Sequence, residues 1–197
     1  MRIKSSVVVI LMAVGLSACS LSQAPQHEVK VADQPFASGG TIDMQLSGGS
    51  YSVRPSADDH IRVTLSVGQD NPSKTGLTID KTSAKLTIED TPKNNFSATI
   101  EVPKATDLVI RLSGGDLNAD AISGNKDIET EAGNVQIAVG DPNDYASVDA
   151  SVKAGNLSSG PFGESKSGLA QNLNWTGHGK YKLHVQLGAG NLELRAK

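Results

Sequence analysis

Four oxygen-bearing side chains, Asp116, Asn118, Asp120 and Asp127, have a spacing that could bind a calcium ion. In a twelve-residue calcium loop, oxygen ligands at the first, third and fifth positions and an acidic residue at the last surround the ion. The sixth position requires glycine for a sharp turn, and this chain has Ala121 there. We therefore expect no metal site and interpret the segment as part of a strand repeat.

The sequence contains no recognisable constellation of catalytic side chains. The four histidines, at positions 27, 60, 178 and 184, are not spaced as metal ligands. The chain lacks the Gly-x-Ser-x-Gly motif of serine hydrolases and the glycine-rich P-loop that binds phosphates. Its Asp and Glu residues are scattered, whereas general acid–base catalysis needs paired groups in perturbed environments. We expect neither catalytic residues nor a cofactor.

Two aromatic residues, Trp175 and Tyr181, flank a short segment that contains two glycines. Their rings could stack on a sugar, which makes them candidate ligand-binding residues. They could also cover an open end of the hydrophobic core. We favour the second interpretation and keep the first as an alternative.

The N-terminus has the features of an export signal. Arg2 and Lys4 precede an apolar run over residues 7–16, which is too short to span a bilayer as a helix. The run ends in Leu-Ser-Ala-Cys19, which resembles the lipobox of bacterial lipoproteins. The resemblance implies that Cys19, the only cysteine, is lipidated and becomes the first mature residue. Because Ser20 follows it, the resemblance also implies transfer to the outer membrane, with the body facing the periplasm or, as the alternative, exposed at the cell surface.

The expected organisation is a signal peptide over 1–18, a lipidated flexible tether over 19–34 and one β-strand-repeat domain over 35–197. Within the tether, residues 28–31 are a candidate first strand. The lipid on Cys19 would hold the protein on the membrane. A net charge of −3 at pH 7 argues against binding to nucleic acid.

A repeated corner organises this domain. Two alternating strands meet at a pair of small residues that Asp or Asn usually follows, as in IETEAGNVQI. The second small residue is Gly49, Gly115, Gly133, Gly155 or Gly190, and the polar residues that follow four of them are Asp116, Asn134, Asn156 and Asn191. Glycine tolerates a positive φ without steric penalty, and Asp or Asn can hydrogen-bond the backbone in a turn.

Apolar residues lie five and three places before the corner glycine, and two and four places after it. This alternation predicts strands with one buried face. The last inward position before the corner and the first inward position after it are five residues apart. This is an odd number, so a flat strand would turn its apolar face over, and the chain must bend at the corner to keep one apolar face.

The intervals between corners predict a repeat of about 20 residues. Successive corner glycines at 115, 133 and 155 are 18 and 22 residues apart, and the other intervals are near multiples of the same unit. One such unit would be a rung of a β-solenoid, which stacks on its neighbours. The alternative is a β-sandwich of hairpins with Gly-Asn turns, which fits the alternation equally well.

The segments IEVPKATDLVIRLSGGDLNADAISGNKDIETEAGNVQI and GKYKLHVQLGAGNLELRAK resemble the bacterial putative-adhesin family of β-strand-repeat proteins, also called toastrack domains. Ile100, Val102 and Pro103 match the opening strand of that family, and the corners match its repeats. The resemblance covers roughly residues 41–197 and is weaker before 97. It implies a right-handed single-stranded β-helix-like fold without established enzymatic activity.

We therefore expect a non-enzymatic lipoprotein of the cell envelope whose rigid β-body presents loops to a protein or glycan. The alternative function is a polysaccharide-processing enzyme, because β-helices can host such sites. The two differ in whether carboxylates converge in a groove.

The anchoring hypothesis predicts that Cys19→Ala abolishes lipidation and membrane retention, because the chain has no other thiol to acylate. Labelling with radioactive palmitate, followed by membrane fractionation, measures both effects. A Cys19→Ala protein that stays on the membrane like the wild type would contradict the lipoprotein interpretation.

Overall fold

The computed structural model describes residues 27–68, 73–163 and 165–196, which fold into β-strands with two short 3-10 turns, η1 (Pro142–Asp144) and η2 (Gly160–Phe162). No helix in this described part is long and apolar enough to cross a membrane. Cys19 and the rest of the export signal lie outside the described residues.

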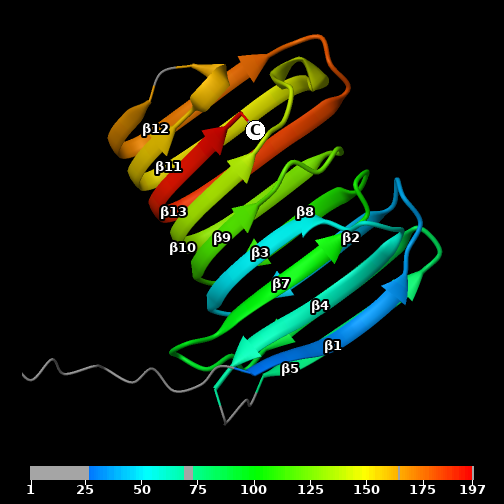
Figure 1. Ribbon diagram of the computed structural model, residues 1–197. Coiled ribbons are helices and arrows are strands. Elements are labelled where there is room, and N and C mark those ends of the chain that lie inside the picture. Colours follow the sequence, from blue (N-terminus) through cyan, green and yellow to red (C-terminus); the bar gives the residue numbers. More distant parts are fainter. Residues whose placement is uncertain (1–26, 69–72, 164, 197) are drawn as a thin grey trace, which may run out of the picture.

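We call two strand segments that meet at a corner or loop a rung, with a first arm before the corner or loop and a second arm after it, and neighbouring rungs lie side by side in one sheet (Figure 1). The first arms are β2 (Thr41–Leu46), β6 (Ser83–Glu89), β8 (Asp107–Leu112) and the first halves of β10 (Lys126–Ala138), β11 (Tyr145–Ser158) and β13 (Tyr181–Arg195). The second arms are β3 (Gly49–Pro55), β7 (Ser97–Val102), β9 (Gly115–Ala119) and the second halves of β10, β11 and β13.

Neighbouring rungs pair in parallel and in register, with corner beside corner. Gly133 lies opposite Gly115 on one side and Gly190 on the other. Gly115 lies in turn opposite Gly49, and Gly190 opposite Gly155. The two arms that meet at a corner pair with neighbouring rungs and not with each other, since β2 pairs with β6 and β8 while β3 pairs with β7 and β9. The corner is therefore not a hairpin turn.

The order of the rungs differs from the order of the sequence. The last strand, β13, lies between β10 and β11 and pairs in parallel with both. The regular spacing predicted that the corners at Gly133 and Gly155 would be neighbours, and this prediction is wrong because Gly190 lies between them. One edge of β11 pairs with the antiparallel strand β12 (Lys166–Thr176). Its other edge pairs with β13, which separates β11 from β10.

Antiparallel strands end the stack on both sides (Figure 1). Beyond β11 lies β12, and at the opposite end β5 (Lys74–Asp80) pairs with β6 while β4 (His60–Val67) pairs with β7. The outermost strand is β1 (His27–Pro35), antiparallel to β4. Within the expected tether, the strand begins at His27 and runs to Pro35, so it is longer than the strand expected over 28–31 and leaves no flexible connection over 32–34.

Strand β1 pairs with β4 through its backbone, and charge pairs that periodicity cannot reveal add to this pairing. The Asp33 carboxylate accepts hydrogen bonds from Lys30 at 2.6 Å and from Arg62 of β4 at 3.3 Å, and lies 2.8 Å from the His60 ring. These contacts keep the pKa of Asp33 well below its usual range, with the Lys30 and His60 hydrogen bonds as the main causes.

The core lies between the two arms, where the alternating side chains of every rung meet. The row five places before the corner glycine is completely buried and consists of Met44, Ile110, Ile128, Ala150 and Val185, each 0% exposed. Burial of one such Ile or Val stabilises the fold by roughly 1.5–3 kcal/mol. Because the rungs are in register, these side chains form continuous apolar ladders along the stack.

Corner glycines are required for two independent reasons. Gly133 has φ of 135° and Gly155 has φ of 138°, a region that side chains with a Cβ rarely adopt. A Cβ on Gly133 would also lie 1.7 Å from the carbonyl oxygen of Gly115, and one on Gly155 would lie 1.8 Å from that of Gly190. The backbones approach too closely at the corner to admit any side chain.

We predict that Gly133→Val lowers the free energy of unfolding by about 3 kcal/mol or more, because backbone strain and overpacking both contribute. The exposed control Ser165→Val should change it by less than about 0.5 kcal/mol. Urea melts of the two variants measure the difference. Wild-type stability in Gly133→Val would contradict the corner geometry.

The rung order predicts which pairs of corners are coupled. Gly133→Val combined with Gly190→Val should be non-additive, because these two corners touch. Gly133→Val combined with Gly155→Val should be additive within about 0.5 kcal/mol, since a rung separates them. The reverse result would contradict the insertion of β13.

Candidate functional site

A groove runs across the first arms just before the corners, perpendicular to the strands. It crosses β6, β2, β8, β10, β13 and β11 and has a cavity volume of about 590 Å³. We call it the first-arm groove. It exists because outward side chains on six strands are brought side by side by the in-register pairing.

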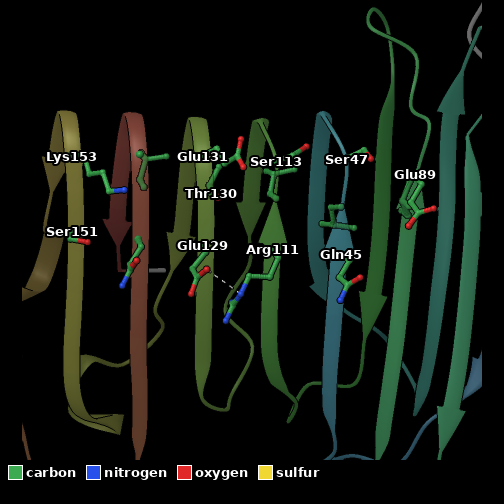
Figure 2. Close-up of a pocket in the computed structure, with 16 residues that line it drawn as sticks. Gln45, Ser47, Glu89, Arg111, Ser113, Glu129, Thr130, Glu131, Ser151 and Lys153 are labelled. Carbon is green, nitrogen blue, oxygen red and sulfur yellow. Dashed lines mark ion pairs between the residues drawn. The ribbon is translucent and has the colours of Figure 1, made fainter.

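Two rows of side chains line the first-arm groove (Figure 2). One row, four places before the corner glycine, consists of Gln45, Arg111, Glu129, Gln186 and Ser151, in the order of the strands. The other row, two places before it, consists of Ser47, Ser113, Glu131, Gly188 and Lys153. Within each row the positions recur at the strand spacing of about 4.8 Å, and every position carries a polar side chain except Gly188.

The positive charge of Arg111 is paired with acidic side chains beside it in the groove. Its guanidinium donates a hydrogen bond to the carboxylate of Asp127 at 2.9 Å and lies 3.3 Å from Glu129. The hydrogen bond with Asp127 raises the pKa of Arg111, so the side chain stays charged. Figure 2 shows the ion pair with Glu129 lying across adjacent strands.

A notch separates two charges that remain unpaired. The carboxylate of Glu131 on β10 and the ammonium of Lys153 on β11 have no hydrogen-bond or ion-pair partner among the described residues. Between them, β13 carries Gly188, and a Cβ there would lie 2.2 Å from the carbonyl oxygen of Glu131. The notch is two strand spacings wide, about 9–10 Å, with opposite charges on its two sides.

On the other side of the corner, the second arms carry a separate hollow of about 510 Å³, which we call the second-arm hollow. Its polar lining consists of Ser50 and Ser52 of β3, Ser97 and Thr99 of β7, Asp116 and Asn118 of β9, and Asn134 and Gln136 of β10.

The polar residues that follow the corner glycines form a hydrogen-bonded ladder. Asn156 donates to Asn191 at 2.7 Å, Asn191 donates to Asn134 at 2.7 Å, and Asn134 donates to Asp116 at 2.8 Å. All three amide groups donate in the same direction along the stack, and the last acceptor is the carboxylate of Asp116. The ladder therefore fixes the orientation of each amide in it.

Asp127, the last of the four residues with calcium-like spacing, lies on the first arms, apart from Asp116 and Asn118 in the second-arm hollow. Asp116 accepts from Asn134, Asn118 accepts from Arg195 at 3.1 Å, and Asp127 pairs with Arg111 on the first arms. Among the described residues, no group of three or more His, Cys, Asp or Glu side chains could hold a metal ion. Their spacing reflects the strand repeat.

Trp175 and Tyr181 belong to an aromatic cluster at the β11 end of the stack. The Trp175 ring packs against Phe162 with centroids 5.0 Å apart, and Tyr181 packs edge-on against Tyr145 at 6.4 Å. Tyr145 and Phe162, both buried, join these pairs at 5.8 Å. The Lys180 ammonium also lies 4.6 Å from the centre of the Tyr181 ring. Both candidate rings are half-buried against the core, and neither lines the groove or the hollow.

No family model and no curated protein matches the sequence. A crystal structure described as a "putative cell adhesion protein" from Clostridium sporogenes covers 88% of this chain and 100% of its own, with a TM-score of 0.59 and 12% identity. Another, described as a "putative adhesin" from Bacteroides fragilis, covers 85% of this chain and 97% of its own, with a TM-score of 0.28 and 10% identity. The first likeness concerns the fold alone, and the second is too weak to support an argument.

Lys126 is a buried polar residue that the sequence analysis missed. It lies in an inward row between Leu108 and Leu183 and is 2% exposed. Its ammonium donates to the carbonyls of Ile122 at 2.6 Å and Gly124 at 3.3 Å, and to the Tyr145 hydroxyl at 3.0 Å. Lys126 lies two residues before Ile128 in the same strand, so the alternation that predicted Ile128 as buried also predicts that Lys126 points inward.

Burial lowers the pKa of Lys126 to about 8. Between this value and the ordinary 10.5, the unfolded chain holds a proton that the folded chain has lost, so stability rises with pH across this window. We predict a rise of up to roughly 3 kcal/mol in the wild type, which Lys126→Met lacks. Urea melts at pH 7.5 and 10.5 measure it, with the exposed Lys85→Met as a control that keeps the rise. Equal pH dependence in all three proteins would contradict the buried environment.

Proposed function

We propose that this chain is a non-enzymatic, adhesin-like lipoprotein of the cell envelope that binds a partner protein along the first-arm groove. The observation that carries the proposal is the pair of aligned polar rows with unpaired opposite charges at the Gly188 notch.

A protein surface suits this groove better than a uniformly charged polymer does. The notch places a carboxylate and an ammonium on opposite sides, and a folded partner can supply one group of each sign at a fixed separation. Complementary charges of this kind give specificity and a faster encounter, whereas polar groups at the rim add little affinity. Rigid strands position the rows, which limits the entropy lost on binding.

The envelope location rests on Cys19 and the export signal, by resemblance to bacterial lipoproteins. We propose that the lipid anchors the protein in the outer membrane with the body facing the periplasm. The solved structure from Clostridium sporogenes, which shares this fold and is described as a cell adhesion protein, supports a binding role.

We also propose that the body is a right-handed single-stranded β-helix-like solenoid. Parallel, in-register rungs and stacked corners support this interpretation, because a sandwich of hairpins would pair the two arms of a corner with each other. The insertion of β13 and the antiparallel end strands are departures from a simple solenoid.

The binding proposal predicts that a photo-crosslinking residue at position 186, in the groove, captures one defined protein in intact cells. Glu131→Lys in the same protein should reduce that crosslink at least tenfold, because it places two cations at the notch.

The matched control is Asp59→Lys, which makes the same change of charge at an exposed position near β4. It should leave the crosslink unchanged. An equal loss in both variants, or crosslinking that is indifferent to Glu131→Lys, would contradict the groove as the binding site.

A further inference from the structure

The second-arm hollow differs in chemistry from the first-arm groove. Its polar lining consists of hydroxyl and amide side chains, and Asp116 is its single carboxylate. No Lys or Arg lines it, although Arg195 at its margin donates to Asn118. The hollow therefore provides hydrogen-bond donors and acceptors with little net charge.

Some polar groups in the hollow are positioned by hydrogen bonds, and others have unused hydrogen-bonding capacity. The Asn134 amide is fixed on both sides, since it donates to Asp116 and accepts from Asn191. Asn118 accepts from Arg195, and its amide hydrogens have no partner among the described residues. The side chains of Ser52, Thr99 and Gln136 likewise have no hydrogen-bond partner in the described part of the chain.

These properties favour one class of ligand. An anionic ligand would meet the Asp116 carboxylate with no lining cation to balance it. A cationic ligand would find one carboxylate, which already accepts a hydrogen bond from Asn134. A neutral, hydroxyl-rich ligand can donate to the carboxylate and amide oxygens and accept from the amides and hydroxyls. The volume of about 510 Å³ lies within the range of small-ligand pockets.

The repeat adds a second argument. Polar side chains recur on β7, β3, β9 and β10 at the strand spacing of about 4.8 Å, so a ligand of repeating units can make related contacts on successive strands. We propose that the second-arm hollow binds an uncharged oligosaccharide, with Thr99, Asn118, Asn134 and Gln136 as its hydrogen-bonding groups. This site is separate from the protein-binding groove and does not depend on it.

The test is isothermal titration calorimetry of the full chain in detergent with neutral hexasaccharides of glucose, galactose, mannose and N-acetylglucosamine, and with hexagalacturonate as the acidic probe. At least one neutral hexasaccharide should bind, and hexagalacturonate should bind at least tenfold more weakly. Thr99→Val, which replaces a hydroxyl by a methyl group, and Gln136→Ala should each weaken binding at least fivefold.

The matched controls lie on the first arms. Thr87→Val makes the same isosteric change at a half-buried outward position of β6, and Gln186→Ala removes the same amide from the groove; neither should change saccharide binding. Glu131→Lys should also leave it intact while it removes the protein crosslink, so the two proposals fail separately. Absence of binding by every neutral probe, preference for hexagalacturonate, or binding that Thr99→Val and Gln136→Ala leave unchanged would overturn the assignment.

Discussion

The close approach of backbones at the stacked corners is the constraint on which the rest of the structure depends. A Cβ at Gly115 would lie 2.0 Å from the carbonyl oxygen of Gly49, and one at Gly190 would lie 1.8 Å from that of Gly133. At these corners the backbones are in direct contact and leave no room for a side chain, whereas the Gly49 corner at the end of the series meets the Phe96 ring on its other side. A shift of one rung by a single residue would replace this contact by a clash and would turn its core side chains outward.

In-register stacking produces the core and the two surface sites together. Inward residues form apolar ladders, while outward residues form polar rows on both sides of the corner. The ladder from Asn156 to Asp116 lies beside the corner and fixes the Asn134 amide, which lines the second-arm hollow. The first-arm groove instead carries several charged side chains. Arg111 is paired with Asp127 and Glu129, whereas Glu131 and Lys153 have no partner among the described residues.

Two polar residues interrupt the apolar ladders near β10. Lys126 has all three ammonium hydrogens directed at acceptors, which compensates for its burial. Thr130, 5% exposed, has a hydroxyl without a partner among the described residues and lies at the edge of the first-arm groove. An unsatisfied buried hydroxyl lowers the free energy of unfolding by about 1–3 kcal/mol, so Thr130 destabilises the fold next to the notch.

The sequence by itself determined the local structure: alternation predicted the inward residues, and the Gly-Asn pairs predicted where the chain bends. Both follow from the period of a strand and the steric freedom of glycine, which act within a few residues. Trp175 and Tyr181 could be selected by residue type, but their packing against Phe162 and Tyr145 could not.

Only the tertiary structure decided which edges pair. Strand β13 lies between β10 and β11 although it is last in the chain, and β1 pairs with β4 where the sequence predicted a tether. Similar corners offer similar backbone edges, so local sequence does not distinguish one partner from another. The groove, the notch and the hollow each combine residues from three or more strands, and their positions follow from that choice of partners.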